Sequence, residues 1–446
     1  MKCFAARFLP AALFAVVTLT PAMVSGAAYE ADPSNYRSIL KSLTPGDVLT
    51  LRPGTYTDGL PLHDINGDPG REITIRGTIS EPRPVFRARR GINTISIVDS
   101  SHITLQYLEL DGQGIAVDAV KAEGYSEWAH HIRLDGLVIH GHGANQQVVG
   151  ISTKCPAWAW VIRNNVIIGA GTGIYLGNSD GSAPFINGVI ENNFVADTLG
   201  YNLQIKHQKT RPHLPGMPVE EGATVIRRNV FSKANPLSGE HLPRPNVLVG
   251  HFPLSGAGAK DIYLIHGNFF YQNANTGEAL FQGEGNIAFY NNLLVNNHGN
   301  GVVVHPHNDV PRHVEIFQNT IVASGTGILL KGGHPDFDQR IRSNAVFAGN
   351  PIVALQYPGN FTADFSHAGD FLTNPFGPIG SLNLAPQPGT MDASPIIPTI
   401  PIMRASPYFP YPDAELDFDG SLRTRFIYGA YGDDTAEWPL QLAPRP

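Results

Sequence analysis

The chain is poor in cysteine and poor in charge. Of its 446 residues only 2 are Cys, and 15% are Asp, Glu, Lys or Arg. Cys3 lies in the leader described below, so Cys155 is the single cysteine of the expected mature chain. No disulfide can form within that chain, and we expect Cys155 to be a buried thiol. The fold must therefore be stabilised by its hydrophobic core.

Long apolar runs and polar linkers are also scarce. After residue 27 no stretch approaches the ~20 apolar residues of a membrane span, so we expect no membrane-spanning segment. No polar linker divides the chain, although its length alone would suggest two or three domains. The 47 Gly and 36 Pro stand between many short apolar runs, which predicts many turns and few long helices.

The first residues have the pattern of a signal peptide. Lys2 and Arg7 precede an apolar stretch, residues 8–19, and small side chains follow at 25–28. We predict a signal peptide over residues 1–27 and a secreted or periplasmic protein. The net charge of −7 becomes −9 once the two leader cations are removed. Because the mature chain is acidic, we expect no nucleic-acid partner.

A short phrase recurs along the chain: an apolar strand, an Asn, and then further apolar residues. The recurring Asn residues are 24 to 39 positions apart, at Asn165, Asn193, Asn229, Asn268, Asn292, Asn319 and Asn344. Such a spacing suits the coils of a solenoid, two of which carry long loops. An Asn amide can bond the backbone at a turn and the next Asn along a stack, so we predict a structural asparagine ladder. Earlier coils begin at His102 and His131, with Gly at the turn.

A second strand follows in each coil, in seven segments that begin at Gly150, Gly173, Asn202, Asn246, Ala279, Gly301 and Gly327. Because strands alternate, the second and fourth residues of each segment should face the core and the third and fifth should face outward. The fifth-residue row is Lys154, Gly177, Lys206, Gly250, Gly283, His305 and Lys331. The same alignment puts Phe281 outward, and it puts Thr153 and Gln282 inward.

These patterns predict an all-β, single-domain right-handed parallel β-helix with an N-terminal cap and long loops from the middle coils. We expect a cap and first coils over 28–100, central coils with a catalytic groove over 101–358, and C-terminal coils with a closing segment over 359–446. The segments LTPGDVLTLRPGTY, ending at Tyr56, and ITIRG, ending at Gly77, resemble the pectin-lyase-like superfamily. The start of the mature chain is especially similar to chondroitinase B and the alginate lyases grouped with it. The segment that ends at Gly432 resembles the closing segment of many such proteins.

Charged residues gather around the middle coils. We expect His251 about 5 Å and Glu284 about 10 Å from Lys206 along the stack. Neighbouring cations should lower the pKa of Lys206, so that a neutral amine can act as general base. In a β-elimination of a uronate glycan, Arg211, His251 or Arg244 would neutralise the carboxylate, and His207 or His251 would protonate the leaving oxygen. The expected catalytic residues are Lys206, His207, His251 and Arg211, and the expected substrate-binding residues are Lys154, Tyr175, Gln204, Arg244, Glu284, His305 and Lys331.

The leading hypothesis is thus a secreted polysaccharide lyase that acts as a monomer and whose partner is an anionic polysaccharide or oligosaccharide. A glycoside hydrolase needs two carboxyl groups, and the outward rows supply only Glu284, so a loop acid such as Glu220 or Glu240 would be required. A C5-epimerase shares the proton-abstraction step. A non-enzymatic glycan-binding solenoid is the remaining alternative.

The resemblance also implies a calcium ion, held by two acids on the strand before the base lysine, and an arginine on the next coil. Here Asn202 and Gln204 stand on that strand, and the next coil offers Gly250 and His251. We therefore assign no cofactor and no metal ligands from the resemblance, and Ca²⁺ remains open.

Overall fold

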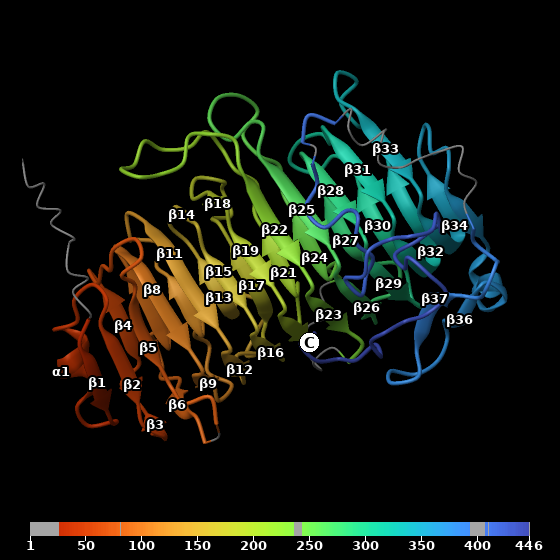
Figure 1. Cartoon of the computed structure of the whole chain (residues 1–446). Coiled ribbons are helices and arrows are strands. Elements are labelled where there is room, and N and C mark those ends of the chain that lie inside the picture. Colours follow the sequence, from red (N-terminus) through yellow and green to blue (C-terminus); the bar gives the residue numbers. More distant parts are fainter. Residues whose placement is uncertain (1–25, 81, 236–242, 393–405, 409, 446) are drawn as a thin grey trace, which may run out of the picture.

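The computed structural model describes residues 26–80, 82–235, 243–392, 406–408 and 410–445 (Figure 1). The predicted leader lies almost wholly outside these residues, and its cleavage stays a prediction. Short strands of each coil pair in parallel with those of the next coil, and they form three long ladders, called here faces 1, 2 and 3.

Face 1 consists of β1 (Ala28–Ala31), β2 (Val48–Leu51), β5 (Ile73–Arg76), β8 (Ser100–Gln106), β11 (Ala129–Asp135), β15 (Val161–Arg163), β19 (Val189–Glu191), β22 (Ala223–Arg227), β25 (Ile262–His266), β28 (Ile287–Tyr290), β31 (Val314–Phe317) and β33 (Gln339–Arg342), with β14 (Ala157–Trp158) and β18 (Phe185–Ile186) beside them. Face 2 consists of β3 (Gly54–Tyr56), β6 (Pro84–Arg87), β9 (Glu109–Asp111), β12 (Val138–His140), β16 (Val166–Ile168), β20 (Phe194–Ala196), β23 (Val230–Lys233), β26 (Phe269–Asn273), β29 (Leu293–Asn296), β32 (Thr320–Leu330), β34 (Ala345–Val353) and β35 (Phe361–Ala363). Face 3 consists of β4 (Leu60–His63), β7 (Ile95–Val98), β10 (Val120–Ala122), β13 (Val149–Thr153), β17 (Thr172–Leu176), β21 (Leu203–Ile205), β24 (Val247–Val249), β27 (Ala279–Gly283) and β30 (Asn300–Val304), and it continues into the second halves of β32 and β34.

The remaining elements are short. They are α1 (Tyr36–Leu40), the 3₁₀ helix η1 (Phe365–Asp370), and the antiparallel pair β36 (Leu372–Asn374) and β37 (Asn383–Pro386). Figure 1 shows the coils stacked along one axis from the first strands to β34. The predicted all-β, right-handed parallel β-helix is confirmed. The expected boundaries at 28, 101 and 359 stay predictions. No helix in the described residues is long and apolar enough to cross a membrane.

The asparagine ladder forms as predicted. Each ladder Asn donates its side-chain amide to Oδ1 of the next at 2.8–3.0 Å, and its backbone N–H donates to the same oxygen. Asn360 adds an eighth member that the repeat did not predict, because it accepts from Asn344 at 2.8 Å. The left-handed backbone of the turn lies on the residue before the ladder Asn, for example at Asn164 and Arg228, both at positive φ. The ladder Asn residues thus supply hydrogen bonds, and their predecessors make the turn.

The core runs along the axis of the coils and is built from the inward residues of all three faces. The predicted inward pairs Ile174 and Leu176, and Val302 and Val304, are fully buried. Thr153 is also buried, as predicted, and its hydroxyl accepts the Gly177 N–H at 2.8 Å.

The predicted alternation is wrong in β27. Phe281 pairs with Val247 and is fully buried in the core, so it faces inward and Gln282 faces outward. Burying the aromatic ring is favourable, whereas an unpaired amide in the core would be costly. The correction moves Glu284 into the outward row in place of Gly283, directly beside Gly250 and His305.

The C-terminal segment runs back along the outside of the coils (Figure 1). The Arg423 guanidinium donates to the carbonyls of Leu416, Gly429 and Tyr431 and to Oδ1 of Asn291. The three carbonyl bonds hold the segment in its own fold, and the bond to Asn291 fastens it to a middle coil.

Candidate active site

The outward row of face 3 alternates between charged residues and glycine from Lys154 to Glu284. It reads Lys154, Gly177, Lys206, Gly250, Glu284, His305 and Lys331, in the register of the strand pairs. A Cβ on Gly177 would lie 3.3 Å from Cβ of Lys206, and a Cβ on Gly250 would collide with the backbone of His207. The glycines therefore leave open space between charged side chains that stand about 10 Å apart, two coils of the stack.

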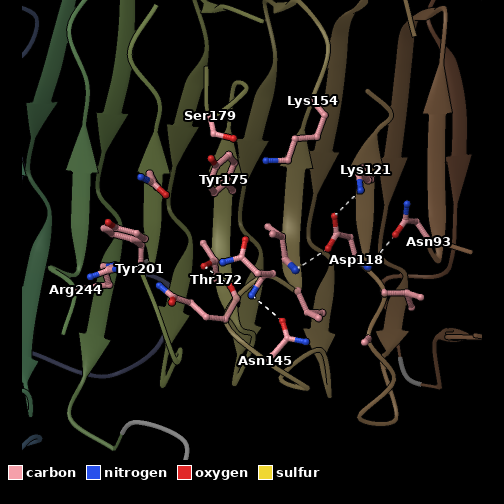
Figure 2. Close-up of a pocket in the computed structure, with 17 residues that line it drawn as sticks. Asn93, Asp118, Lys121, Asn145, Lys154, Thr172, Tyr175, Ser179, Tyr201 and Arg244 are labelled. Carbon is pink, nitrogen blue, oxygen red and sulfur yellow. Dashed lines mark hydrogen bonds and ion pairs between the residues drawn. The ribbon is translucent and has the colours of Figure 1, made fainter. Parts of the chain in front are cut away.

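A cavity of about 570 Å³ lies on face 3 on the N-terminal side of Lys206 (Figure 2). Four of the predicted substrate-binding residues line it: Lys154, Tyr175, Gln204 and Arg244. It is also lined by residues that the repeat did not indicate, namely Asn93, Asp118, Lys121, Asn145 and Tyr201. Lys121 lies in the same outward row as Tyr175 and Gln204, one coil before the first segment aligned in the sequence. Extending that alignment back to β10 would have found it.

Positive charge is concentrated at this cavity. The Lys154 ammonium lies 3.3 Å from the centre of the Tyr175 ring. The pKa of Lys154 is lowered to about 8, chiefly by burial and also by Lys121 and Lys206, while Asp118 acts in the opposite direction. Lys121 lies 3.4 Å from the Asp118 carboxylate, whose pKa is raised by burial. Two lysines and Arg244 thus face one carboxylate, and the cavity suits an anionic ligand.

Lys206, His207 and His251 lie together, as predicted. Lys206 is half-buried, and its pKa is lowered by burial, whereas Glu284 acts to raise it. The cause of the lowered pKa is thus desolvation rather than the expected neighbouring cations. The rings of His207 and His251 are 5.3 Å apart, and the pKa of His207 is lowered by burial and then by His251 and Lys206.

The tautomer of His251 is fixed by its neighbour. Its Nδ1 lies 2.7 Å from the Phe252 carbonyl oxygen. Because a carbonyl only accepts, Nδ1 carries the proton and Nε2 is the free position of the neutral ring.

Two predicted site residues have structural roles instead. The Arg211 guanidinium is 2% exposed, is paired with Asp261 and donates to the Pro218 carbonyl at 3.1 Å. Glu284 is 2% exposed, and its Oε2 accepts three backbone N–H groups, those of residues 307–309, at 2.8–3.1 Å. Both side chains are buried and engaged by these partners, so we expect neither to contact a substrate. This corrects the roles expected for them.

The remaining predicted residues lie further along face 3. His305 sits beside Glu284, its Nδ1 2.7 Å from the Pro306 carbonyl and its Nε2 3.4 Å from the Gln282 amide. Lys331 is exposed one coil later. Neither lines the cavity, so only a substrate that extends along several coils would reach them.

The strand before Lys206 is not arranged to hold a cation. Asn202 is fully buried, and its amide donates to Thr198 Oγ1 and the Ser232 carbonyl. In the described part of the chain, the one group of three or more His, Cys, Asp or Glu side chains close enough to share a metal ion lies on face 1, not here.

Comparisons with known proteins agree with the coil architecture. No protein-family model matches the chain, and no curated protein matches its sequence. Its structure is similar to an alginate lyase from Paenibacillus sp. str. FPU-7, at 18% identity and a TM-score of 0.41, over 73% of this chain and 99% of that one. It is also similar to a GH136 lacto-N-biosidase from Eubacterium ramulus, at 10% identity and a TM-score of 0.43, over 76% of this chain and 68% of that one.

A third similar structure is the A-module of a mannuronan C-5 epimerase from Azotobacter vinelandii, at 14% identity and a TM-score of 0.42, over 71% of this chain and 89% of that one. The resemblance to alginate lyases stated from the sequence is thus confirmed as a structural similarity. At these identities and TM-scores it carries no argument about activity, and the proposals below rest on the residues of the groove.

Proposed function

We propose that this protein is a secreted polysaccharide lyase that cleaves an anionic, uronate-containing glycan by β-elimination, with Lys206 as the base. One observation supports it above the others. Two lysines with lowered pKa values, Lys154 and Lys206, stand on one outward row on either side of Gly177. Lys154 lines the cavity, which carries more positive than negative charge, and Lys206 lies next to it on the row, outside the lining.

The two lysines suit different tasks. The π face of Tyr175 favours the charged form of Lys154, which fits it to bind a uronate carboxylate together with Arg244. Within the described residues, Nζ of Lys206 makes no hydrogen bond, ion pair or ring contact, and the electrostatic effect of Glu284, which favours the protonated amine, is outweighed by burial. A half-buried amine of this kind is suited to general-base catalysis.

The proposed reaction balances as follows. Cations at the carboxylate make the hydrogen on C5 more acidic, and the Lys206 amine takes that proton. The electron pair of the C5–H bond becomes the C4–C5 double bond, and the C4–O bond breaks. The leaving oxygen takes a proton from Nε2 of His251 in its imidazolium form, because the neutral ring carries its one proton on Nδ1, at the Phe252 carbonyl.

The test is a panel of acidic polysaccharides incubated with the purified chain. Elimination creates a conjugated double bond, so ultraviolet absorbance should rise together with reducing ends. Reducing ends without that absorbance would indicate hydrolysis, and a changed C5 configuration without cleavage would indicate an epimerase. Binding without any chemical change would support the glycan-binding solenoid.

A further inference from the structure

Three histidines meet on face 1, whereas the proposed site lies on face 3. They come from two neighbouring strands of face 1, His102 from β8 and His130 and His131 from β11, which lie side by side in Figure 1. One ring nitrogen of each lies within 4.8 Å of the other two. The nearest pair is Nδ1 of His130 and Nδ1 of His131, at 2.8 Å.

Left-handed backbone at His102 and His131 brings the rings together. Successive side chains of a strand point to opposite sides, so His130 and His131 should diverge. His131 has φ +52° and His102, its counterpart on β8, has φ +53°. The same left-handed conformation recurs at the equivalent residues of the next two coils, Ala159 and Asn187, so it is a repeated feature of the stack. Here it turns His131 back toward His130 and stacks it on His102, with ring centroids 4.3 Å apart.

The surroundings hold the rings and leave one side open. His130 stacks on Trp158 of the next coil at 4.4 Å and lies 4.8 Å from Trp128. His102 and His131 line a cavity of about 410 Å³ together with Glu72. The Glu72 carboxylate in the lining of this cavity favours a bound cation. Trp128 and Trp158 hold the His130 ring in place.

We propose that His102, His130 and His131 bind a divalent transition-metal ion of the zinc type, with a fourth position open to the cavity. Imidazole nitrogens are ligands that zinc, copper and nickel accept well. Two nitrogens bound to one tetrahedral zinc at 2.0–2.1 Å are about 3.3 Å apart, so the three rings need only small side-chain movements to reach that geometry. The open position would be filled by water or by Glu72.

The site is independent of the proposed lyase reaction, because it lies on another face.

The experiment uses the full mature chain without a histidine tag, freed of metal by a chelator and titrated with Co²⁺ and then Zn²⁺. The expected result is one equivalent of Co²⁺ per chain with the strong visible absorption of a four-coordinate ion, displaced by one equivalent of Zn²⁺. The variants His102→Asn and His131→Asn keep a residue that tolerates the left-handed backbone, and His130→Phe keeps the stacking on Trp158. Each should abolish the cobalt band.

The matched control is His367→Asn, because His367 is exposed and paired only with Asp370 among the described residues. It should leave the titration unchanged. If the ligand variants do not fold, X-ray absorption spectroscopy of the zinc-loaded natural chain still tests the proposal. The spectrum should fit three imidazole ligands on the zinc ion. A chain that takes up no stoichiometric Co²⁺, a band that persists in the folded variants, or a zinc ion without imidazole ligands would overturn the proposal.

Discussion

The ammonium nitrogen of Lys154 lies 3.3 Å from the centre of the Tyr175 ring, on the neighbouring coil of the same face. A cation over an aromatic ring at a desolvated site is stabilised by about 0.5–2 kcal/mol. This contact keeps a positive charge inside the cavity even though burial disfavours it. Removing this contact therefore tests directly whether the cavity binds anionic glycans.

Replacing the ring tests that contact. Tyr175→Leu removes the π face, and KM for an acidic polysaccharide should rise about 2- to 30-fold, the factor that corresponds to the energy of a cation–π contact. Tyr175→Phe is the matched control, because it keeps the ring and removes only the hydroxyl, and it should bind nearly as the natural chain does. Equal KM values for the Leu and Phe variants would show that the contact does not serve binding.

Binding should also depend on pH in a defined direction. The pKa of Lys154 is lowered from the ordinary value of 10.5 to about 8, so its ammonium group is present below pH 8 and is lost as the pH rises above it. The affinity for an uncleaved uronate oligosaccharide, measured by calorimetry in the Lys206→Ala background, should fall above about pH 8. Lys154→Gln should bind more weakly at neutral pH and should lose this dependence. A pH profile that is the same in both proteins would exclude Lys154 from binding.

Arg211 should matter for stability rather than for chemistry. It is paired with Asp261, which also accepts the backbone N–H of Gly222 at 3.0 Å. Arg211→Ala leaves a buried carboxylate unpaired and should lower the free energy of unfolding by about 3–5 kcal/mol in denaturant titrations. The double variant Arg211→Met with Asp261→Asn should recover much of this loss. A folded Arg211→Ala protein with normal stability and no activity would restore the catalytic role first expected for this residue.

The asparagine ladder should be weakest at its end. Asn292 accepts two bonds from Asn268 and donates to Asn319 and to the Ile265 carbonyl, all of them buried. Asn292→Ala leaves several of these buried groups without a hydrogen-bond partner, each at a cost of about 1–3 kcal/mol, and should lower Tm strongly. Asn360→Ala, at the half-exposed end of the ladder, should lower Tm much less. Similar losses at both positions would mean that the ladder bonds do not carry the stability of the coils.

The sequence predicted the features that recur in every coil. The Asn positions and the inward aliphatic pairs recur in every coil, so their period gave the fold and most of the outward row. A one-residue offset at Ala279 was enough to reverse the predicted directions of Phe281 and Gln282. Lys121 was missed because its coil turns at Tyr107 and Leu108 and carries no Asn marker.

The partners of charged side chains could not be predicted in this way. Arg211 meets Asp261 from 50 residues away, and Glu284 meets backbone N–H groups of a loop more than 20 residues later. The histidine cluster depends on left-handed backbone at His102 and His131, which no local pattern of the sequence indicates for those residues. Such contacts follow from the packing of loops and coils, not from the period of the repeat.

The most direct test of the proposed chemistry is the rate at which Lys206→Ala forms unsaturated products from the polysaccharide that the natural chain cleaves. The substitution lies at a half-buried surface position beside Gly177 and should leave the fold intact by circular dichroism. The account predicts loss of the absorbance increase, with glycan binding through Lys154 and Arg244 retained. A folded Lys206→Ala protein that still forms unsaturated products at the natural rate would show that the base lies elsewhere.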